Sequence, residues 1–158
     1  MRTLLGAFLW TLFLFLVLLL HRREEKRRLA EYRGLCRLVF HVKDALARAP
    51  EPLPLVYARF EDDALSHAGF LSFLREKGLF HALSCGVLHL DEEDLSPFMS
   101  YAHGLGNRLY TDEKAAVAAL SSEAAAHLSQ REAALPRKER LTGTLFFSGG
   151  MLILLLLL

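Results

Sequence analysis

The stretch LAEYRGLCRLVFHVKDAL, residues 29–46, decides the fold class of this chain. Its apolar residues return at steps of three and four, which is the period of one face of an α-helix. The members of this apolar stripe are Leu29, Tyr32, Leu35, Cys36, Val39, Val42 and Leu46. The spacing predicts one amphipathic helix over residues 22–49, which Gly34 weakens slightly because glycine is a poor helix former.

Helical patterns continue after this stretch. Three prolines in APEPLP, residues 49–54, end the first helix, and the last of them can open the next one. Residues 53–64 and 70–83 carry further helical stripes, with a join at residues 67–69 and a bend at Gly78.

The second half of the chain is predicted to hold two more helices. In LDEEDLSP, residues 90–97, we favour a helix start at Ser96-Pro97, because a start at Asp91 would place Pro97 inside the helix. That helix is predicted to end at HGLG, where a glycine supplies a left-handed cap. An alanine-rich helix then begins at Thr111-Asp112, and Pro136 should kink or restart it. Since no strand pattern stands out, the sequence predicts an all-α helical bundle.

The two ends of the chain are apolar. Residues 3–20 (TLLGAFLWTLFLFLVLLL) and 141–158 (LTGTLFFSGGMLILLLLL) contain no charged residue. As helices, each would be ~27 Å long, which is just enough to cross a bilayer. The sequence therefore predicts an N-terminal transmembrane helix over 1–21, a helical domain over 22–140 and a C-terminal transmembrane helix over 141–158. A cleaved signal with a lipid-anchored tail is the alternative, and the length of the first apolar stretch argues against it.

Basic residues flank the apolar ends on the side of the central domain. The two clusters are Arg22, Arg23, Lys26, Arg27 and Arg28, and Arg137, Lys138 and Arg140. The positive-inside rule places both clusters on the cytoplasmic face of a cell membrane, where they would lie against anionic lipid. The predicted protein is therefore a double-pass membrane protein with a cytoplasmic domain.

The centre of the chain is acidic. Residues 29–130 contain nine basic and fourteen acidic residues, a formal net charge of −5. Two acidic runs stand out and form a candidate surface for docking a protein partner: Glu61, Asp62 and Asp63, and Asp91, Glu92, Glu93 and Asp94. A solvated helix face and a helix cap are the simpler interpretations of these runs.

The sequence contains no recognisable catalytic or metal-binding motif. The seven histidines and two cysteines make neither an H-E-x-x-H motif nor a set with zinc spacing, and GLGNR is not followed by the lysine of a P-loop. We therefore expect no enzyme activity, no metal, no cofactor and no nucleic acid. The alternative is a membrane-tethered helical enzyme or sensor, whose pocket would need His81, His89 and His103 to converge near residues 91–94.

One pair of features suggests how the two apolar ends pack. Trp10 lies ~15 Å from the Leu20 boundary along a helix, and Gly149 and Gly150 lie ~12–14 Å from Leu141. Both positions fall near the middle of a bilayer, where tryptophan is less common than at the interfaces. We predict that the indole packs over the glycine pair and joins the two spans into a hairpin.

The order of these features resembles the stage III sporulation protein AB family. The resemblance rests on LLGA at Leu4–Ala7, the arginine pair after the first span, PLP at Pro52–Pro54, the turn at Leu105-Gly106, the alanine-rich helix and the ending TGTLFFSGGMLILLLLL. It extends over essentially the whole chain and depends more on the layout than on any single motif.

The resemblance implies a fold, a location and partners. The cytoplasmic domain would be similar to that of the platform proteins of type II secretion and type IV pilus systems. The protein would be a non-enzymatic platform or adaptor of the channel complex between mother cell and forespore, on the mother-cell side of the membrane around the forespore. Its partner would be a secretion-type ATPase similar to the stage III sporulation protein AA, together with other proteins of that complex. These implications rest on analogy at the level of the fold.

Overall fold

The computed structural model describes residues 2–105 and 108–157. Within its helices, the side chains that are not described are those of residues 2–5, 7–9, 11, 14, 136–143, 145–147 and 150–157. The chain divides into two compact units. One unit is Arg27–Ser129, and the other joins residues 1–26 to residues 130–158.

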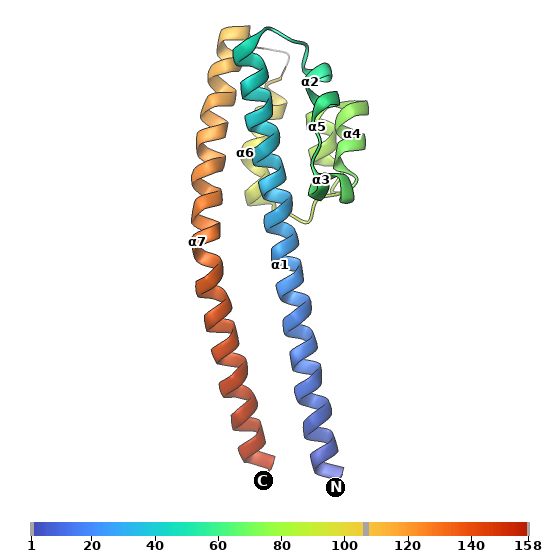
Figure 1. Ribbon diagram of the computed structural model, residues 1–158, viewed down its shortest axis with the longest axis vertical. Coiled ribbons are helices and arrows are strands. Elements are labelled where there is room, and N and C mark those ends of the chain that lie inside the picture. The colour runs from blue at the N-terminus through green and yellow to red at the C-terminus, as the bar shows by residue number, and fades with distance from the viewer. Residues whose placement is uncertain (1, 106–107, 158) are drawn as a thin grey trace. The chain divides into compact units, whose positions relative to one another are not determined.

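All regular structure among the described residues is helical, which confirms the predicted all-α class. Two long helices, α1 and α7, each contribute residues to both units, and five shorter helices connect them (Figure 1). The helices are α1 (Arg2–Arg48), α2 (Leu53–Arg59), α3 (Asp63–His67), α4 (Phe70–Lys77), α5 (Leu79–Ser84), α6 (Glu92–His103) and α7 (Tyr110–Leu157).

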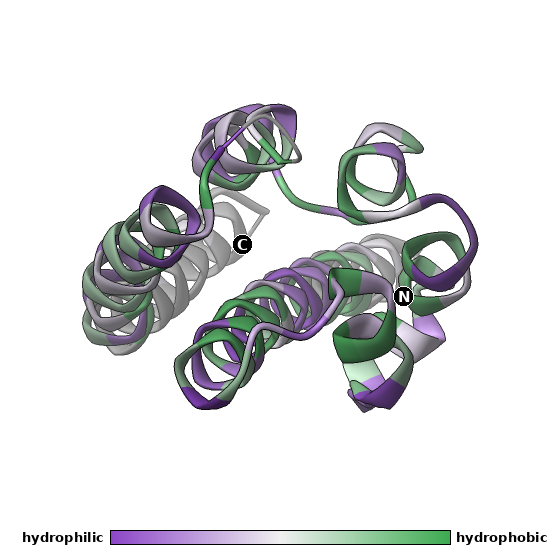
Figure 2. Ribbon diagram, turned by 90° about the horizontal axis from the view of Figure 1, so that it is seen from above, coloured by the Kyte–Doolittle hydropathy of each residue, from purple (hydrophilic) through white to green (hydrophobic). Residues whose placement is uncertain are grey.

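Helix α1 is a single helix that includes both the first apolar stretch and the amphipathic stretch (Figure 1). Figure 2 shows hydrophilic and hydrophobic residues alternating along the ribbons. All seven residues of the predicted apolar stripe are buried: Leu29, Tyr32, Leu35, Cys36, Val39, Val42 and Leu46. This burial confirms that the three-and-four spacing identifies the face of α1 that the rest of the Arg27–Ser129 unit covers.

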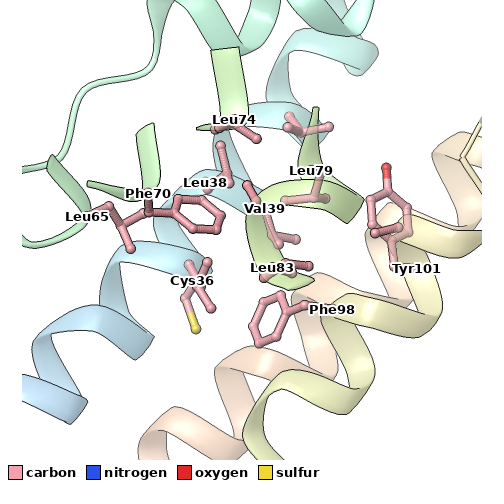
Figure 3. Packing of buried hydrophobic residues seen from close by; sticks show 14 of the residues in the cluster. Cys36, Leu38, Val39, Leu65, Phe70, Leu74, Leu79, Leu83, Phe98 and Tyr101 are labelled. Carbon is pink, nitrogen blue, oxygen red and sulfur yellow. The ribbon is translucent and has the colours of Figure 1, made fainter. Parts of the chain in front are cut away.

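The core of the Arg27–Ser129 unit joins α1 to helices from the second half of the chain. The ring of Tyr32 packs edge-on against Phe98 of α6, with centroids 5.7 Å apart. The thiol of Cys36 donates a hydrogen bond to the Ala124 carbonyl of α7, with a sulfur–oxygen distance of 3.7 Å. Figure 3 shows side chains of α1, α3, α4, α5 and α6 turning toward one another in this core. Burial of such apolar area supplies most of the stability of a helical bundle.

The region predicted as one helix over residues 53–64 forms two short helices. Helix α2 ends at Arg59, and Phe60 adopts an extended backbone as its C-cap. Asp62 then begins α3 by accepting a hydrogen bond from the Leu65 amide at 3.1 Å. Helices end at both the predicted join at residues 67–69 and the predicted bend at Gly78, and Gly69 and Gly78 have positive φ angles, which favour glycine.

Helix α6 starts earlier than predicted. Asp91 is the N-cap residue, and its carbonyl accepts hydrogen bonds from the amides of Asp94 and Leu95. The predicted start at Ser96-Pro97 is therefore wrong, and Pro97 lies inside the helix. The missing amide of Pro97 is tolerated because the carbonyl that loses its donor belongs to Glu93, which is exposed to water.

The residues after α6 differ from the prediction too. Gly104 has φ −80° and is right-handed, so it does not supply the expected left-handed cap, and Gly106 lies outside the described residues. Helix α7 begins at Tyr110, and Leu109 accepts its first hydrogen bond, from the Glu113 amide at 2.9 Å. The helix continues through Pro136 without a restart. Among the residues described, no helix combines the length and the apolarity that crossing a membrane would require.

Gly34 marks a close approach between α1 and the start of α3. A Cβ atom at this position would lie 2.7 Å from Cγ of Leu65 and 2.9 Å from Oδ1 of Asp62. Real Cβ atoms essentially never come that close to another heavy atom. Gly34 is therefore a packing requirement, whereas the sequence suggested only a slight weakness of the helix.

Candidate functional site

The acidic run at residues 91–94 stands at the start of α6 and is held by α1. Nη1 of Arg28 lies 3.0 Å from Oδ1 and 3.1 Å from Oδ2 of Asp91. The side chains of this pair are 36% and 63% exposed. Glu92 and Glu93 are exposed, whereas Asp94 is buried. The run therefore contains one carboxylate that faces the protein interior, one that pairs with α1 and two that face water.

A buried glutamate on α1 holds the residues that lead into this run. Glu31 is 1% exposed, and its carboxylate accepts hydrogen bonds from the His89 amide at 2.7 Å and from Nε of Arg27 at 3.2 Å. Nδ1 of the His89 ring lies 3.1 Å from the same carboxylate. A buried carboxylate with several donors holds a segment strongly, because removing the donors would leave a charge without solvation. Glu31 therefore positions the backbone just before α6.

Sequence reasoning missed Glu31, although a signal for it exists. Glu31 precedes Leu35, Leu38 and Val42 at steps of four, three and four residues, so it lies on the apolar face of α1. An acidic residue on the buried face of a helix needs a partner that donates hydrogen bonds to it. That partner, His89, could not be identified from the sequence.

The other acidic run, residues 61–63, is also held by α1. Asp62 is buried and caps α3, and its Oδ2 lies 3.1 Å from Nη2 of Arg37. Glu61 and Asp63, on either side of it, are exposed. Arg28 and Arg37 are nine residues apart on α1, a rise of ~13.5 Å, so two positions on one helix secure the two acidic runs.

This geometry corrects the predicted docking surface. Asp62 and Asp94 are 6% and 2% exposed, so neither can lie on a surface that a partner touches. Asp62 instead anchors the backbone at the start of α3, where it accepts from the Leu65 amide. The acidic residues that remain accessible are Glu61, Asp63, Asp91, Glu92 and Glu93, and whether a partner binds them stays a prediction.

The first basic cluster divides between two kinds of environment. Arg27 and Arg28 pair with Glu31 and Asp91, so both already have carboxylate partners inside the Arg27–Ser129 unit. Arg23 and Lys26 are exposed, and Arg22 is half-buried. The side chains of the second cluster, Arg137, Lys138 and Arg140, lie outside the described residues. Contact of either cluster with lipid stays a prediction.

The predicted packing of Trp10 on the glycine pair is untested. Trp10 is 50% exposed, and its ring stacks on Phe13 at a centroid distance of 6.0 Å. A Cβ atom on Gly149 would meet no atom within 4 Å, and Gly150 is among the residues whose side-chain surroundings are not described. Simultaneous substitution of both glycines by leucine, followed by a measurement of assembly, remains the test.

A second group of buried polar side chains lies where α2, α6 and α7 meet. Tyr57, Tyr101 and Glu113 are 4%, 5% and 8% exposed. Burial, followed by the charge of the Glu113 carboxylate, holds the pKa of Tyr57 well above its usual range. The pKa of Tyr101 is also raised, by burial first and then by hydrogen bonding to the Glu113 carboxylate and by its charge. The two phenols therefore stay neutral at any pH near neutrality, and Glu113 contributes its carboxylate at the start of α7, where the helix dipole favours negative charge.

The histidines invoked for an enzyme or a sensor have separate neighbours. His89 contacts Glu31, whereas the His103 ring packs on Phe80 with a centroid distance of 5.8 Å. Within the part of the chain that the structure describes, no three His, Cys, Asp or Glu residues are grouped so as to hold a metal ion. A hollow of about 220 Å³ between α1 and α2 is lined by Arg48 and Arg59 but also by Asp44 and Glu51, so it favours neither sign of charge.

Comparison with known proteins adds no relative. No family model, no curated protein and no solved structure matches the chain.

Proposed function

We propose that this protein is a non-enzymatic membrane platform. In this proposal, residues 3–20 and 141–158 anchor the chain in a cell membrane, and the Arg27–Ser129 unit presents acidic residues to a protein partner in the cytoplasm. Support for the anchors comes from the sequence, since both stretches are free of charged residues and have basic residues beside them.

The observation that carries the proposal is that each of the two acidic runs contains one buried carboxylate among exposed ones. Asp62 and Asp94 are buried, whereas their neighbours Glu61, Glu92 and Glu93 are exposed. Asp62 caps α3, and Glu31 holds the His89 amide just before α6, so the exposed members keep a defined geometry. A rigid acidic surface suits recognition of a basic patch on a partner, because little entropy is lost when the surface binds.

The resemblance to the stage III sporulation protein AB family suggests which partner this is. The partner would be a secretion-type ATPase similar to the stage III sporulation protein AA, within the channel complex between mother cell and forespore. The chain would lie on the mother-cell side of the membrane around the forespore. This identification of the partner rests on analogy. The acidic surface itself requires only that the partner present a basic patch.

The test is a binding measurement with charge reversal. Full-length protein in lipid nanodiscs is titrated with the purified ATPase of the same host at low and at high salt. We expect Glu92→Lys together with Glu93→Lys to weaken binding at least ~10-fold at low salt, since two rim contacts become repulsive. Glu123→Lys is the matched control, because Glu123 is an exposed glutamate of α7 outside both runs.

Three results would contradict parts of the proposal. Unchanged affinity in the Glu92/Glu93 variant would mean that the acidic surface does not dock the ATPase. Release of the wild-type chain from host membranes by alkaline carbonate would mean that it is not anchored. Arrest of the forespore after engulfment in a deletion strain would support the sporulation role, and a normal spore yield would speak against it.

A further inference from the structure

Asp91 occupies a capping position without capping. It has the backbone angles of an N-cap residue, φ −75° and ψ 158°, yet its side chain makes no hydrogen bond to the first amides of α6. Both carboxylate oxygens are instead turned to Nη1 of Arg28. Aspartate in this position ordinarily accepts a hydrogen bond from an amide two or three residues later. One carboxylate thus has two alternative partners, the start of α6 and an arginine on α1.

Arg28 also has two alternative partners if the chain is anchored as proposed. It follows Leu20 by eight residues on the continuous helix α1, a rise of ~12 Å. Side chains on a helix lean toward its N-terminus, so an arginine released from Asp91 could extend in that direction. At that depth it would meet the phosphate groups of the lipid, and a guanidinium binds phosphate as readily as carboxylate.

We propose that anionic phospholipid draws Arg28 away from Asp91, and that the released carboxylate of Asp91 then caps α6. This inference rests on the membrane anchoring proposed above. An ion pair as exposed as this one is weak, and attraction of an arginine to an anionic lipid surface is of the same order. A helix cap contributes a comparable amount, so the gain at α6 favours the exchange.

The exchange involves side chains alone. Glu31 continues to hold the His89 amide, and the Asp91 carbonyl continues to accept from Asp94 and Leu95, so the backbone before α6 stays in place. The change is confined to the first turn of α6, which contains the exposed Glu92 and Glu93. That turn would become more ordered when the protein lies on an anionic membrane. Lipid charge would thereby regulate the surface that we propose for docking.

The test is hydrogen exchange of the full-length protein in liposomes. Exchange of the backbone amides of residues 92–95 is compared between purely zwitterionic liposomes and liposomes that contain phosphatidylglycerol. We expect exchange to be about fivefold slower on the anionic liposomes, which corresponds to a gained N-cap. Equal exchange in the two kinds of liposome would overturn the inference.

Three variants distinguish the switch of Arg28 from Asp91 to lipid from a general effect of lipid on hydrogen exchange. Arg28→Gln should show the slow exchange in both kinds of liposome, because Asp91 is already free to cap. Asp91→Ala should show the fast exchange in both. Arg23→Gln, the matched control, should keep the wild-type response, since the exposed Arg23 lies outside the pair. A lipid response that persists in Arg28→Gln would overturn the inference.

Two further measurements identify the source of the phosphate and separate this inference from the proposed function. If inorganic phosphate at matched ionic strength slows exchange on zwitterionic liposomes equally, the claim for lipid is overturned. Extraction with alkaline carbonate reports anchoring independently. If the chain stays in the membrane but its hydrogen exchange does not depend on lipid charge, only the switch of Arg28 from Asp91 to lipid is refuted. If the chain is released, the anchoring is refuted.

Discussion

Replacing Gly34 with alanine tests whether α3 lies as close to α1 as the structure shows. On helix propensity alone, the substitution would stabilise the protein by ~1 kcal/mol, because alanine is the best helix former and Gly34 lies inside α1. The close approach to Leu65 and Asp62 predicts the opposite sign, since the new methyl group would overlap both side chains.

The size of the effect follows from what must move. Leu65 is fully buried, so it cannot turn into solvent, and overpacking of this kind costs ~1–3 kcal/mol. Displacement of Asp62 would also weaken the cap of α3, which costs ~1 kcal/mol. After the propensity gain is subtracted, we expect a net loss of ~1–3 kcal/mol, or ~2–12 °C in Tm for a chain of this size.

The assay is thermal and urea unfolding of the full-length protein in detergent, followed by circular dichroism. Gly6→Ala is the matched control, because Gly6 belongs to the same helix and a Cβ there would meet no atom within 4 Å. Combining Gly34→Ala with Leu65→Ala should cost less than the two changes added separately, because the shortened side chain relieves the overlap. A stabilised Gly34→Ala variant would refute the close approach.

Three further predictions concern the buried polar groups. The pKa values of Tyr57 and Tyr101 are raised in the folded protein. The free energy of unfolding should therefore keep its full value below about pH 10 and fall as the pH rises further, because only the unfolded chain ionises there. Absorbance at 295 nm should show the two phenolates appearing only with unfolding, and their titration before unfolding would contradict this. Asp62→Ala should lower the free energy of unfolding by ~1–2 kcal/mol because the cap of α3 is lost, whereas Asp63→Ala should change it by no more than ~0.5 kcal/mol. Equal midpoints of urea unfolding for the two variants would contradict the anchoring role of Asp62. Glu31→Ala should lower the free energy of unfolding by ~2–3 kcal/mol, because the His89 amide and Nε of Arg27 lose their acceptor. A midpoint of urea unfolding equal to that of the wild type would show that Glu31 does not position the segment before α6.

The helical class and the buried face of α1 could be predicted because they depend on local spacing. Leu29, Tyr32 and Leu46 all lie on the stripe that periodicity identifies, and all are buried. Amphipathic spacing is set by the pitch of the helix, so no knowledge of distant contacts is needed. The joins at Gly69 and Gly78 were predictable for the same reason, since a positive φ is a local property of glycine.

Features that depend on distant contacts could not be predicted in this way. The role of Gly34 depends on α3, and the role of Glu31 depends on a histidine 58 residues later. The start of α6 was misplaced because the prediction used the local preference of proline for the first turn, whereas the helix begins at Glu92 and contains Pro97 in its interior. In the acidic runs, charge alone did not separate the buried Asp62 from the exposed Glu61.

The hydrogen bond between Cys36 and Ala124 has a consequence for how the chain is made. The two residues are 88 positions apart, so at ~5–20 residues per second the ribosome needs ~4–18 seconds to deliver the second after the first. Throughout that interval the apolar face of α1 lacks the partners that α7 provides. Nascent chains that stop before α7 should therefore be prone to aggregation, and they should depend on chaperones far more than the complete protein does.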